Sequence, residues 1–448
     1  MLTPDQARDR VTDAIARATK AGADAADAML SAGDSLSVSV RLGALEDVGR
    51  SEHEELGLRV FCGRRSASVS TTDLTPAALD ALAERAVAMA REAPEDQWAG
   101  LAPADRLLHG DVPALDLDDG GIGDPLTLKS AALAAEDAAR AVPGVTNSEA
   151  GSGSASRSVW ALATSHGFAG AYAVTSHSIS ASVLAGENGA MERDYAYHSA
   201  RHARRLESPE VIGRRAGERA VARVNPGRVR SGPMPVVLDP RVGSGMLGHL
   251  AAAISGSAIT RKTSFLLDAM GTQVFAPGIV VRDDPHMPHG LRSRPFDGEG
   301  LPVSPLALID DGVLQSWMLD SAAARQLGLE PTGHASRGIG GAPAVGPSNL
   351  YMEAGKVPVE TLIADITYGV YVTELIGQGV NTVTGDYSRG AAGFLIENGE
   401  ITRPVSEFTV ASTLQTMFRE LTPANDLEFR YGINVPTLRI GGMTVASG

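Results

Sequence analysis

Apolar residues recur at helical spacing in several segments, and each of these segments begins with a capping residue followed by proline. The starts are Thr3-Pro4, Thr75-Pro76, Asp124-Pro125 and Ser208-Pro209. Proline is favoured at the first helical position because its missing N–H would have no partner there. After the first start, Val11, Ala14 and Ala18 lie on one helical face. The pattern therefore predicts a helix after each start.

Between these helices the apolar period falls to two, which is typical of half-buried strands. Leu36, Val38 and Val40 alternate with polar residues in the first half. In the second half, extended segments are expected at residues 159–163, 169–174, 179–184 and 194–197, with a hairpin turn at Asn188-Gly189. Residues 1–95 and 124–224 thus each follow the order helix, strands, helix. The pattern predicts an α+β domain in which an antiparallel sheet is flanked by the helices of two similar halves.

Beyond Asn225 the pattern changes to short apolar runs separated by frequent glycines. Val236-Val237-Leu238 predicts a strand, and a helix is expected from about Gly243 to Ser255. The short strands that follow are typical of a β-barrel or a sandwich. We therefore predict two domains, an N-terminal α+β domain at residues 1–224 and a mostly-β domain at residues 225–448.

Charge and composition narrow the possible function classes. The 39 Lys and Arg residues against 53 Asp and Glu give a net charge of −14, which disfavours specific nucleic-acid binding because phosphates are repelled. A helical stripe of Arg215, Arg219 and Arg223 is interpreted as a solvated face. Cys62 is the only cysteine, which excludes an internal disulfide and a cysteine-rich metal site. With no apolar run of about 18 residues and no signal-like start, we expect a cytoplasmic protein without membrane association.

The densest cluster of metal-binding residue types is Asp283-Asp284-Pro285-His286-Met287-Pro288-His289. Two carboxylates and two imidazoles, from Asp283, Asp284, His286 and His289, could ligate zinc or a similar ion. Prolines set the spacing, however, so these side chains are not arrayed on one helical face. A polar loop is therefore the favoured interpretation.

Two further segments carry residues that could serve a function. His249 is the only titratable group on an apolar helix of small residues, so it is interpreted as a packing residue without a catalytic partner. Asp386 and Arg389 lie in a polar stretch between glycines and could pair with each other or bind a peptide terminus. The favoured interpretation of this stretch is a plain turn whose glycines supply unusual backbone angles.

Four longer motifs are specific enough to indicate a family. They are Arg261-Lys262-Thr263-Ser264-Phe265-Leu266-Leu267-Asp268, Pro295-Phe296-Asp297-Gly298-Glu299-Gly300, Val372-Thr373-Glu374-Leu375-Ile376-Gly377-Gln378-Gly379-Val380 and Thr384-Gly385-Asp386-Tyr387-Ser388-Arg389-Gly390-Ala391-Ala392-Gly393-Phe394. They resemble the PmbA (TldE) branch of the TldD/PmbA family, and the resemblance covers nearly the whole chain. It implies a two-domain protein with a role in a cytoplasmic proteolytic complex, in a family often labelled modulator of DNA gyrase.

The resemblance also says where a metal site would lie. In the TldD branch, a helix with a His-Glu-x-x-x-His motif and a cysteine near the C-terminus hold the metal. In this chain the two histidine positions fall on Gly248 and Ala253, and the glutamate position falls on His249. No cysteine follows Cys62, and neither glycine nor alanine can ligate a metal through a side chain. The resemblance therefore implies a chain with no catalytic residue and no metal of its own.

The predicted function is a non-catalytic subunit of a TldD–TldE-type metallopeptidase that degrades or trims unfolded peptides. The metal, the water activation and the bond cleavage would belong to a TldD-like partner. The isolated chain would be inactive and could form a homodimer. Two alternatives stay open. One is an independent hydrolase that uses unrecognised residues or the set Asp283, Asp284, His286 and His289; the other is a non-enzymatic protein that modulates gyrase or binds another target.

Overall fold

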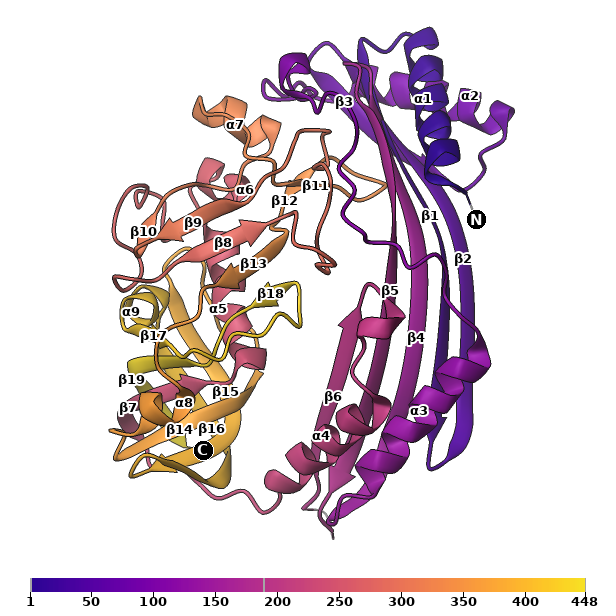
Figure 1. Cartoon of the computed structure of the whole chain (residues 1–448). Helices are drawn as coiled ribbons and strands as arrows, with labels where there is room; N and C mark the ends of the chain where they lie inside the picture. The colour runs from indigo at the N-terminus through magenta and orange to yellow at the C-terminus, as the bar shows by residue number, and fades with distance from the viewer. Residues whose placement is uncertain (1, 188–189, 448) are drawn as a thin grey trace.

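The computed structural model describes residues 2–187 and 190–447, and Figure 1 shows two units side by side. The N-terminal unit, from α1 to α4, has long curved strands. The C-terminal unit, from β7 to β19, has shorter strands around helix α5. The elements of the N-terminal unit are α1 (Pro4–Lys20), β1 (Ala25–Arg41), β2 (Ala44–Cys62), β3 (Arg65–Thr71), α2 (Pro76–Glu92), the short 3-10 turn η1 (Ala104–Arg106), α3 (Pro125–Arg140), β4 (Val145–Thr164), β5 (Ala169–Ala185), β6 (Glu192–Ala200), η2 (Ala203–Arg205) and α4 (Pro209–Ala222).

The N-terminal sheet is antiparallel and has the strand order β3-β2-β1-β4-β5-β6. Strands β1 and β4 pair at its centre, with Leu30 opposite Ala161 and Val38 opposite Gly153. Leu30 and Val38 are an even number of residues apart, so they point to the same face. Leu30 packs with α1 and α2, and Val38 packs with α3. Helices α1 to α4 therefore cover one face, one pair at each end, and the prediction of two similar halves is confirmed.

The predicted helix starts are also confirmed, because α1 to α4 each begin at the expected proline. Thr3 forms a capping box, in which its Oγ1 accepts from Gln6 N–H at 3.2 Å and Gln6 Oε1 accepts from Thr3 N–H at 2.9 Å. The same signature at Asp239-Pro240 starts α5, earlier than the expected Gly243. Across residues 2–187 and 190–447, no helix is both long and apolar enough to cross a bilayer.

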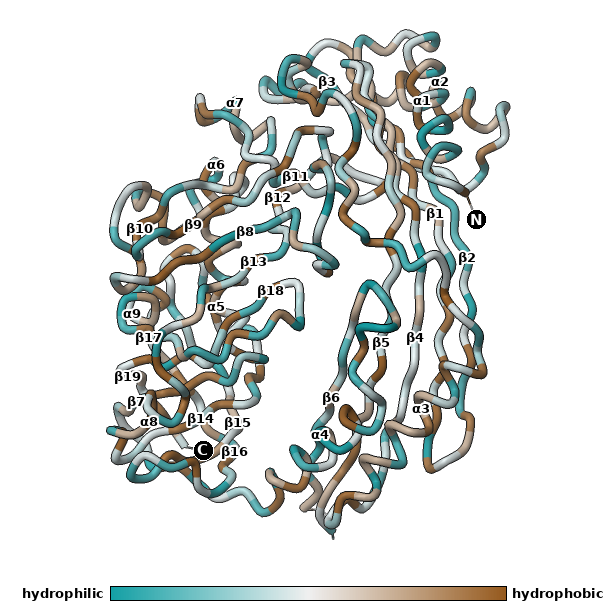
Figure 2. The backbone as a smooth tube through the Cα atoms, in the orientation of Figure 1, coloured by the Kyte–Doolittle hydropathy of each residue, from teal (hydrophilic) through white to brown (hydrophobic). Residues whose placement is uncertain are grey.

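The strands are longer than the apolar pattern indicates. β4 covers 145–164, and β5 joins two segments that the pattern separates. The added length is rich in Gly, Ser and Ala, which interrupt the alternation, and the middle of β4 is pale in Figure 2. Small residues are needed here because α3 lies close: a Cβ on Gly151 would lie 2.4 Å from the Ala132 carbonyl oxygen. The hairpin predicted at Asn188-Gly189 lies outside the described residues.

The C-terminal unit contains a closed barrel. Its strands β16, β15, β14, β7 and β19 close because β16 pairs with β15 on one side and with β19 on the other. A second sheet has the order β10-β9-β8-β13-β18. The prediction of a mostly-β, barrel-like domain is confirmed. The elements of this unit are β7 (Gly232–Leu238), α5 (Pro240–Ala253), α6 (Gly256–Thr260), β8 (Val281–Asp284), β9 (Leu306–Asp310), β10 (Val313–Leu314), α7 (Ser321–Leu327), β11 (Ala335–Ser336), β12 (Ala344–Val345), β13 (Asn349–Met352), α8 (Val359–Ile363), β14 (Tyr368–Ile376), β15 (Asp386–Glu397), β16 (Glu400–Thr413), α9 (Leu414–Arg419), β17 (Leu421–Pro423), β18 (Ile433–Asn434) and β19 (Leu438–Ser447).

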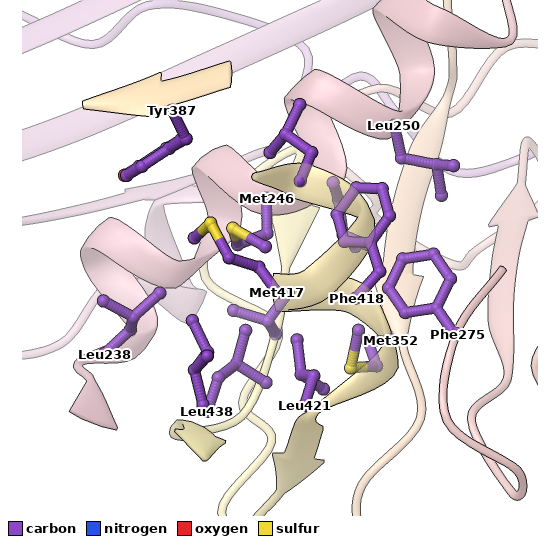
Figure 3. Packing of buried hydrophobic residues seen from close by; sticks show 14 of the residues in the cluster. Leu238, Met246, Leu250, Phe275, Met352, Tyr387, Met417, Phe418, Leu421 and Leu438 are labelled. Carbon is purple, nitrogen blue, oxygen red and sulfur yellow. The ribbon is translucent and has the colours of Figure 1, made fainter. Parts of the chain in front are cut away.

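The apolar core of the C-terminal unit fixes helix α5 (Figure 3). Phe275 and Phe418 stack with their ring centroids 4.2 Å apart. Met246 and Leu250 place the buried face of α5 in the same cluster. Because protein cores are close-packed, α5 cannot rotate without disturbing these contacts, and its opposite face has a defined direction.

The C-terminal unit covers the other face of the N-terminal sheet, near the α1 and α2 end. Met29 on β1 points away from the helices and packs with Phe296 of the C-terminal unit. Arg325 on α7 donates to main-chain carbonyl groups in the loop after α2 at 2.7–3.1 Å. A Cβ on Gly57 would lie 1.7 Å from the Ile339 carbonyl oxygen, so only glycine allows this approach. The two units are therefore packed together through fitted surfaces.

Candidate functional site on helix α5

Helix α5 carries the positions at which the family resemblance places the TldD-type site. Met246 and Leu250 bury one face of the helix in the core. Gly245 and Gly248 lie on another face, where a Cβ on either residue would have no neighbour within 4 Å. At Gly245 and Gly248 the surface of α5 is therefore open, and we call this part of the helix the wall.

The positions that correspond to the family's metal ligands do not fit a metal ion. Gly248 faces open space, whereas Ala253 is 0% exposed, so the two point in different directions and neither offers a ligand atom. His249 lies edge-on to Tyr387, with ring centroids 6.0 Å apart. Burial, and then the nearby Arg389, lowers the pKa of His249, so its ring is neutral at pH 7. Among the described residues no carboxylate forms an ion pair with this ring, although a catalytic histidine normally needs an orienting partner.

A cavity of about 370 Å³, the α5 pocket, lies beside this wall, between β6 of the N-terminal unit and α5, β14 and β15 of the C-terminal unit. Its lining includes Arg241 from α5, Thr373 from β14 and Arg389 from β15. The buried atoms Arg241 Nε, Thr373 Oγ1 and Arg389 Nε have no hydrogen-bond partner within the described part of the chain. Buried polar atoms are costly to leave unpaired. With several arginine side chains in its lining, the α5 pocket can bind a polar ligand such as a peptide backbone or a carboxylate.

Of the two residues predicted to contact a substrate or partner, Arg389 reaches the α5 pocket and Asp386 does not. Both lie on β15, not in a turn. Their odd separation along the strand puts them on opposite faces, so the two side chains do not pair with each other. The Asp386 carboxylate instead accepts from Thr384 Oγ1 at 2.6 Å, and Arg389 Nη2 donates to the Leu375 carbonyl at 3.3 Å.

An ion-pair network forms the wall of the α5 pocket where the two units meet. Arg241 binds Asp194 of β6 through two hydrogen bonds of 2.7 and 3.1 Å. Arg223 of α4 lies 3.5 Å from Asp194 and also contacts Glu374 of β14. Burial by itself raises the pKa of the Asp194 carboxyl, but the Arg241 guanidinium outweighs burial and holds this pKa below its ordinary value. Asp194 is therefore ionised at neutral pH, and the network holds the pocket wall in place.

The arginine stripe on α4 is not the solvated face that the sequence predicts. Arg215 binds Glu207 with hydrogen bonds of 2.9 and 2.8 Å, and Arg430 of the C-terminal unit binds the same carboxylate at 2.9 and 2.8 Å. These two arginines lower the pKa of Glu207 strongly. Together with Arg223, the stripe joins the two units, because its partners come from both.

The structure does not bring the alternative metal set together. The Asp283 carboxylate accepts from Ser348 Oγ at 2.7 Å inside the C-terminal unit. Asp284, its neighbour on β8, points to the opposite face, and its carboxylate accepts from the His286 N–H at 2.8 Å. His289 lies at the interface. The prediction that Asp283, Asp284, His286 and His289 could form one metal site is therefore wrong. Strand alternation and the following turn separate these side chains.

His289 joins a different cluster instead. Its Nδ1 atom, His202 Nε2 and a carboxylate oxygen of Asp116 all lie within 4.8 Å of one another. Asp116 and His202 are absent from the sequence prediction, because the three residues come from distant parts of the chain and share no local motif. The only signal in the sequence is that His202 and His289 are both histidines, a residue type that commonly binds metal ions.

Comparisons with known proteins agree with this architecture. Residues 26–90, 124–224 and 231–447 match, in turn, domain 1, the central domain and the C-terminal domain of the PmbA/TldA metallopeptidase family. The chain is 38% identical to the metalloprotease PmbA of Escherichia coli O157:H7, over 94% of this chain and 92% of that protein. The crystal structure of a candidate modulator of DNA gyrase from Bacteroides thetaiotaomicron superposes with a TM-score of 0.91 at 28% identity, covering 100% of both chains. TldE from Thermococcus kodakarensis has the same fold, with a TM-score of 0.85 at 20% identity, over 98% of this chain and 100% of that chain.

Proposed function

This chain belongs to the PmbA/TldA metallopeptidase family, and we propose that it is a non-catalytic subunit of a TldD–TldE-type peptidase. The observation that carries the proposal is on α5. Gly248 and Ala253 replace the family's metal ligands, one facing open space and the other buried. A TldD-like partner supplies the metal and activates water, and this chain contributes binding surface.

The α5 pocket supports a role in holding the peptide substrate. An unfolded peptide exposes carbonyl oxygens and ends in a carboxylate, and both are hydrogen-bond acceptors. Arg389 and Arg241 both line this pocket, and their guanidinium groups carry donors and no acceptor. Their donors match an acceptor-rich ligand, which binds more strongly to charged donors than to neutral ones.

The surroundings of the pocket explain why a peptide would be held and not cut by this chain alone. His249 is the one histidine on α5, but no carboxylate within the described part of the chain forms an ion pair with its ring. We place the complex in the cytoplasm, because Cys62 is the only cysteine and a reducing compartment suits such a chain.

The test is to co-express this chain with the TldD-like protein of the same genome and to measure assembly and cleavage together. The substrate is an unstructured peptide with a fluorophore and a quencher at its ends. We expect no cleavage by this chain alone, cleavage by the purified complex, and a single complex peak by size-exclusion chromatography with light scattering.

Three outcomes would contradict the proposal in different ways. Cleavage by the isolated chain at the rate of the complex would favour an independent hydrolase. No association with the TldD-like protein would remove the subunit role. Association without any change in peptide cleavage, together with an effect on gyrase supercoiling, would favour a non-enzymatic modulator.

A further inference from the structure

We propose that Asp116, His202 and His289 form a binding site for a divalent transition metal ion of the zinc class, which joins the two units. The three residues come from separate segments. Asp116 lies in the loop between α2 and α3, His202 follows β6, and His289 lies in the loop after β8. The site therefore combines two segments of the N-terminal unit with one of the C-terminal unit.

The spacing of the ligand atoms fits a tetrahedral ion. His202 Nε2 lies 3.2 Å from Asp116 Oδ1, and His289 Nδ1 lies 3.6 Å from Asp116 Oδ2. With metal–ligand bonds of about 2.0–2.1 Å, neighbouring ligands of a tetrahedral zinc ion lie about 3.3 Å apart. All three ligand atoms lie within 4.8 Å of one another, so side-chain rotations that shorten the longer separations would place them around one ion.

Without a cation, the main-chain oxygen of Asp116 can accept a hydrogen bond from each imidazole ring. Both imidazole rings direct a nitrogen at Asp116, at 3.0 Å for His202 and 3.1 Å for His289 from its main-chain oxygen. Their ring centroids are only 4.9 Å apart. A divalent ion at this point would take the place of the two ring protons that face Asp116, and both neutral rings would then offer it lone pairs.

A second carboxylate lies where metal-binding histidines usually have one. The other ring nitrogen of His202, Nδ1, is 3.1 Å from Asp119 Oδ1. Asp119 is itself held by the Ala203 N–H, which donates to its Oδ2 at 2.9 Å. A histidine that binds metal through one nitrogen commonly directs the other to a carboxylate, which fixes the ring and raises its basicity. Asp119 is thus positioned to orient His202.

The donor set and its exposure define the ion and its role. Two imidazoles and one carboxylate favour zinc, cobalt or nickel over magnesium or calcium. The His202 and His289 side chains are only 6% and 16% exposed, whereas Asp116 is 60% exposed and leaves a route for entry. Because the ligands belong to both units, the ion would cross-link the interface and stabilise the assembled chain.

The test measures metal binding by the isolated full-length chain. Metal-stripped protein is titrated with Zn²⁺ against a chromogenic chelator, and Co²⁺ loading is followed by its visible absorption. We expect about one equivalent of Zn²⁺ per chain and a rise in the unfolding temperature on adding Zn²⁺. His289→Gln and Asp116→Asn should each weaken zinc binding by at least tenfold and abolish the thermal shift.

Two further variants make the result decisive. His202→Gln should weaken zinc binding as much as His289→Gln does. If His202→Gln does not fold because His202 is buried, the result rests on His289→Gln and Asp116→Asn, whose side chains are partly or largely exposed. His286→Gln is the matched control, since His286 neighbours the site in sequence but is not a ligand, and it should bind zinc like the wild type. The proposal is overturned if wild-type protein binds no Zn²⁺ at 100-fold molar excess. It is also overturned if binding survives His289→Gln and Asp116→Asn, or if His286→Gln weakens binding equally.

Discussion

Arg337 of the C-terminal unit crosses the interface and contacts Asp27 on β1, and both side chains are almost fully buried, with exposed fractions of 0% and 3%. Asp27 also accepts from Arg59 of β2, whose Nε lies 3.0 Å away. The Asp27 carboxylate thus forms ion pairs with two guanidinium groups, one from each unit. The Arg337 Nη1 and Nη2 atoms have no hydrogen bond of normal geometry within the described residues, so Arg337 depends mainly on this ion pair.

This arrangement predicts an asymmetry between two substitutions. Asp27→Asn leaves two buried guanidinium groups without a carboxylate, and removing one partner of a buried ion pair typically costs about 3–5 kcal/mol. Arg337→Met leaves Asp27 paired with Arg59 and removes an incompletely bonded group, so it should cost clearly less. Urea unfolding followed by tryptophan fluorescence measures both. The exposed Asp47→Asn is the control and should change stability by less than about 0.5 kcal/mol; equal losses for the two interface variants would contradict the interpretation.

Two buried carboxyls in the interface loop predict how stability depends on pH. Burial raises the pKa of Asp297 to about 6 and that of Glu299 to about 7, from ordinary values of 3.8 and 4.5. Between about pH 4.5 and pH 7 the folded chain therefore keeps protons that the unfolded chain has released. Since the folded state binds more protons in this window, the contribution of these groups to stability falls as the pH rises.

Glu299→Gln isolates this effect, because glutamine cannot ionise and can still accept the hydrogen bonds that Ser321 donates to Glu299 at 2.7 and 2.8 Å. Relative to the wild type, the variant should gain roughly 2–3 kcal/mol of stability between pH 4.5 and pH 8. Thermal unfolding across this range measures the difference, with the exposed Glu84→Gln as control. Parallel stability curves for Glu299→Gln and the wild type would show that Glu299 is ionised in the folded chain.

The pattern of the sequence predicts elements best where local chemistry decides them. Proline after a capping residue placed the starts of α1 to α4, since that signal acts within one turn. Strand lengths are harder to predict from the sequence. Gly151 and similar small residues of β4 are present because α3 packs closely against the strand, and they do not follow the apolar alternation of a strand. The barrel-like character of the C-terminal unit followed from short strands, but its closure through β16 and β19 is a long-range pairing with no local signature.

The candidate site was only partly predictable for the same reason. Gly248, His249 and Ala253 were located through the family motif, and Arg389 was identified as a possible contact. The α5 pocket itself depends on Asp194 and Thr373, which come from different units. The Asp116, His202 and His289 cluster is likewise made by the interface, and no spacing along the chain could reveal it.

The positions of the α4 arginines predict weak interaction with nucleic acid. Arg215 and Arg223 form ion pairs with carboxylates of the protein itself, and the net charge of the chain is −14. We expect no sequence-specific duplex DNA complex in a gel-shift assay at about 0.15 M salt. Any weak binding should decrease steeply with salt, because only phosphate contacts would contribute. A complex that prefers one sequence and survives 0.3 M salt would refute this prediction.

The α5 pocket predicts a role for Arg389 in binding substrate. In the complex with a TldD-like partner, Arg389→Met should raise KM by about three- to tenfold, which corresponds to roughly 0.6–1.4 kcal/mol, and leave kcat nearly unchanged. Arg403→Met, an exposed arginine on the neighbouring strand β16, should leave both values unchanged. Steady-state kinetics with a series of peptides measures the effect. A fall in kcat with unchanged KM would mean that Arg389 acts on the reaction and not on binding.

His249 provides the sharpest test of the non-catalytic assignment, because it occupies the glutamate position of the family motif. Its neighbours at the ligand positions, Gly248 and Ala253, cannot hold a metal, and burial favours its neutral form. His249→Ala should therefore leave most of the activity of the complex intact, whereas loss of a true general base costs roughly 10²–10⁴-fold.

The contrasting substitution belongs to the partner, where replacing the glutamate of its His-Glu-x-x-x-His motif should abolish turnover without disturbing assembly. Light scattering checks that both altered complexes form, and elemental analysis checks that the partner keeps its metal. If His249→Ala alone stops cleavage in an assembled, metal-loaded complex, the imidazole takes part in the reaction. The assignment of this chain as a non-catalytic subunit would then be wrong, because its one histidine on α5 would be required for chemistry at a site that only the two chains together complete.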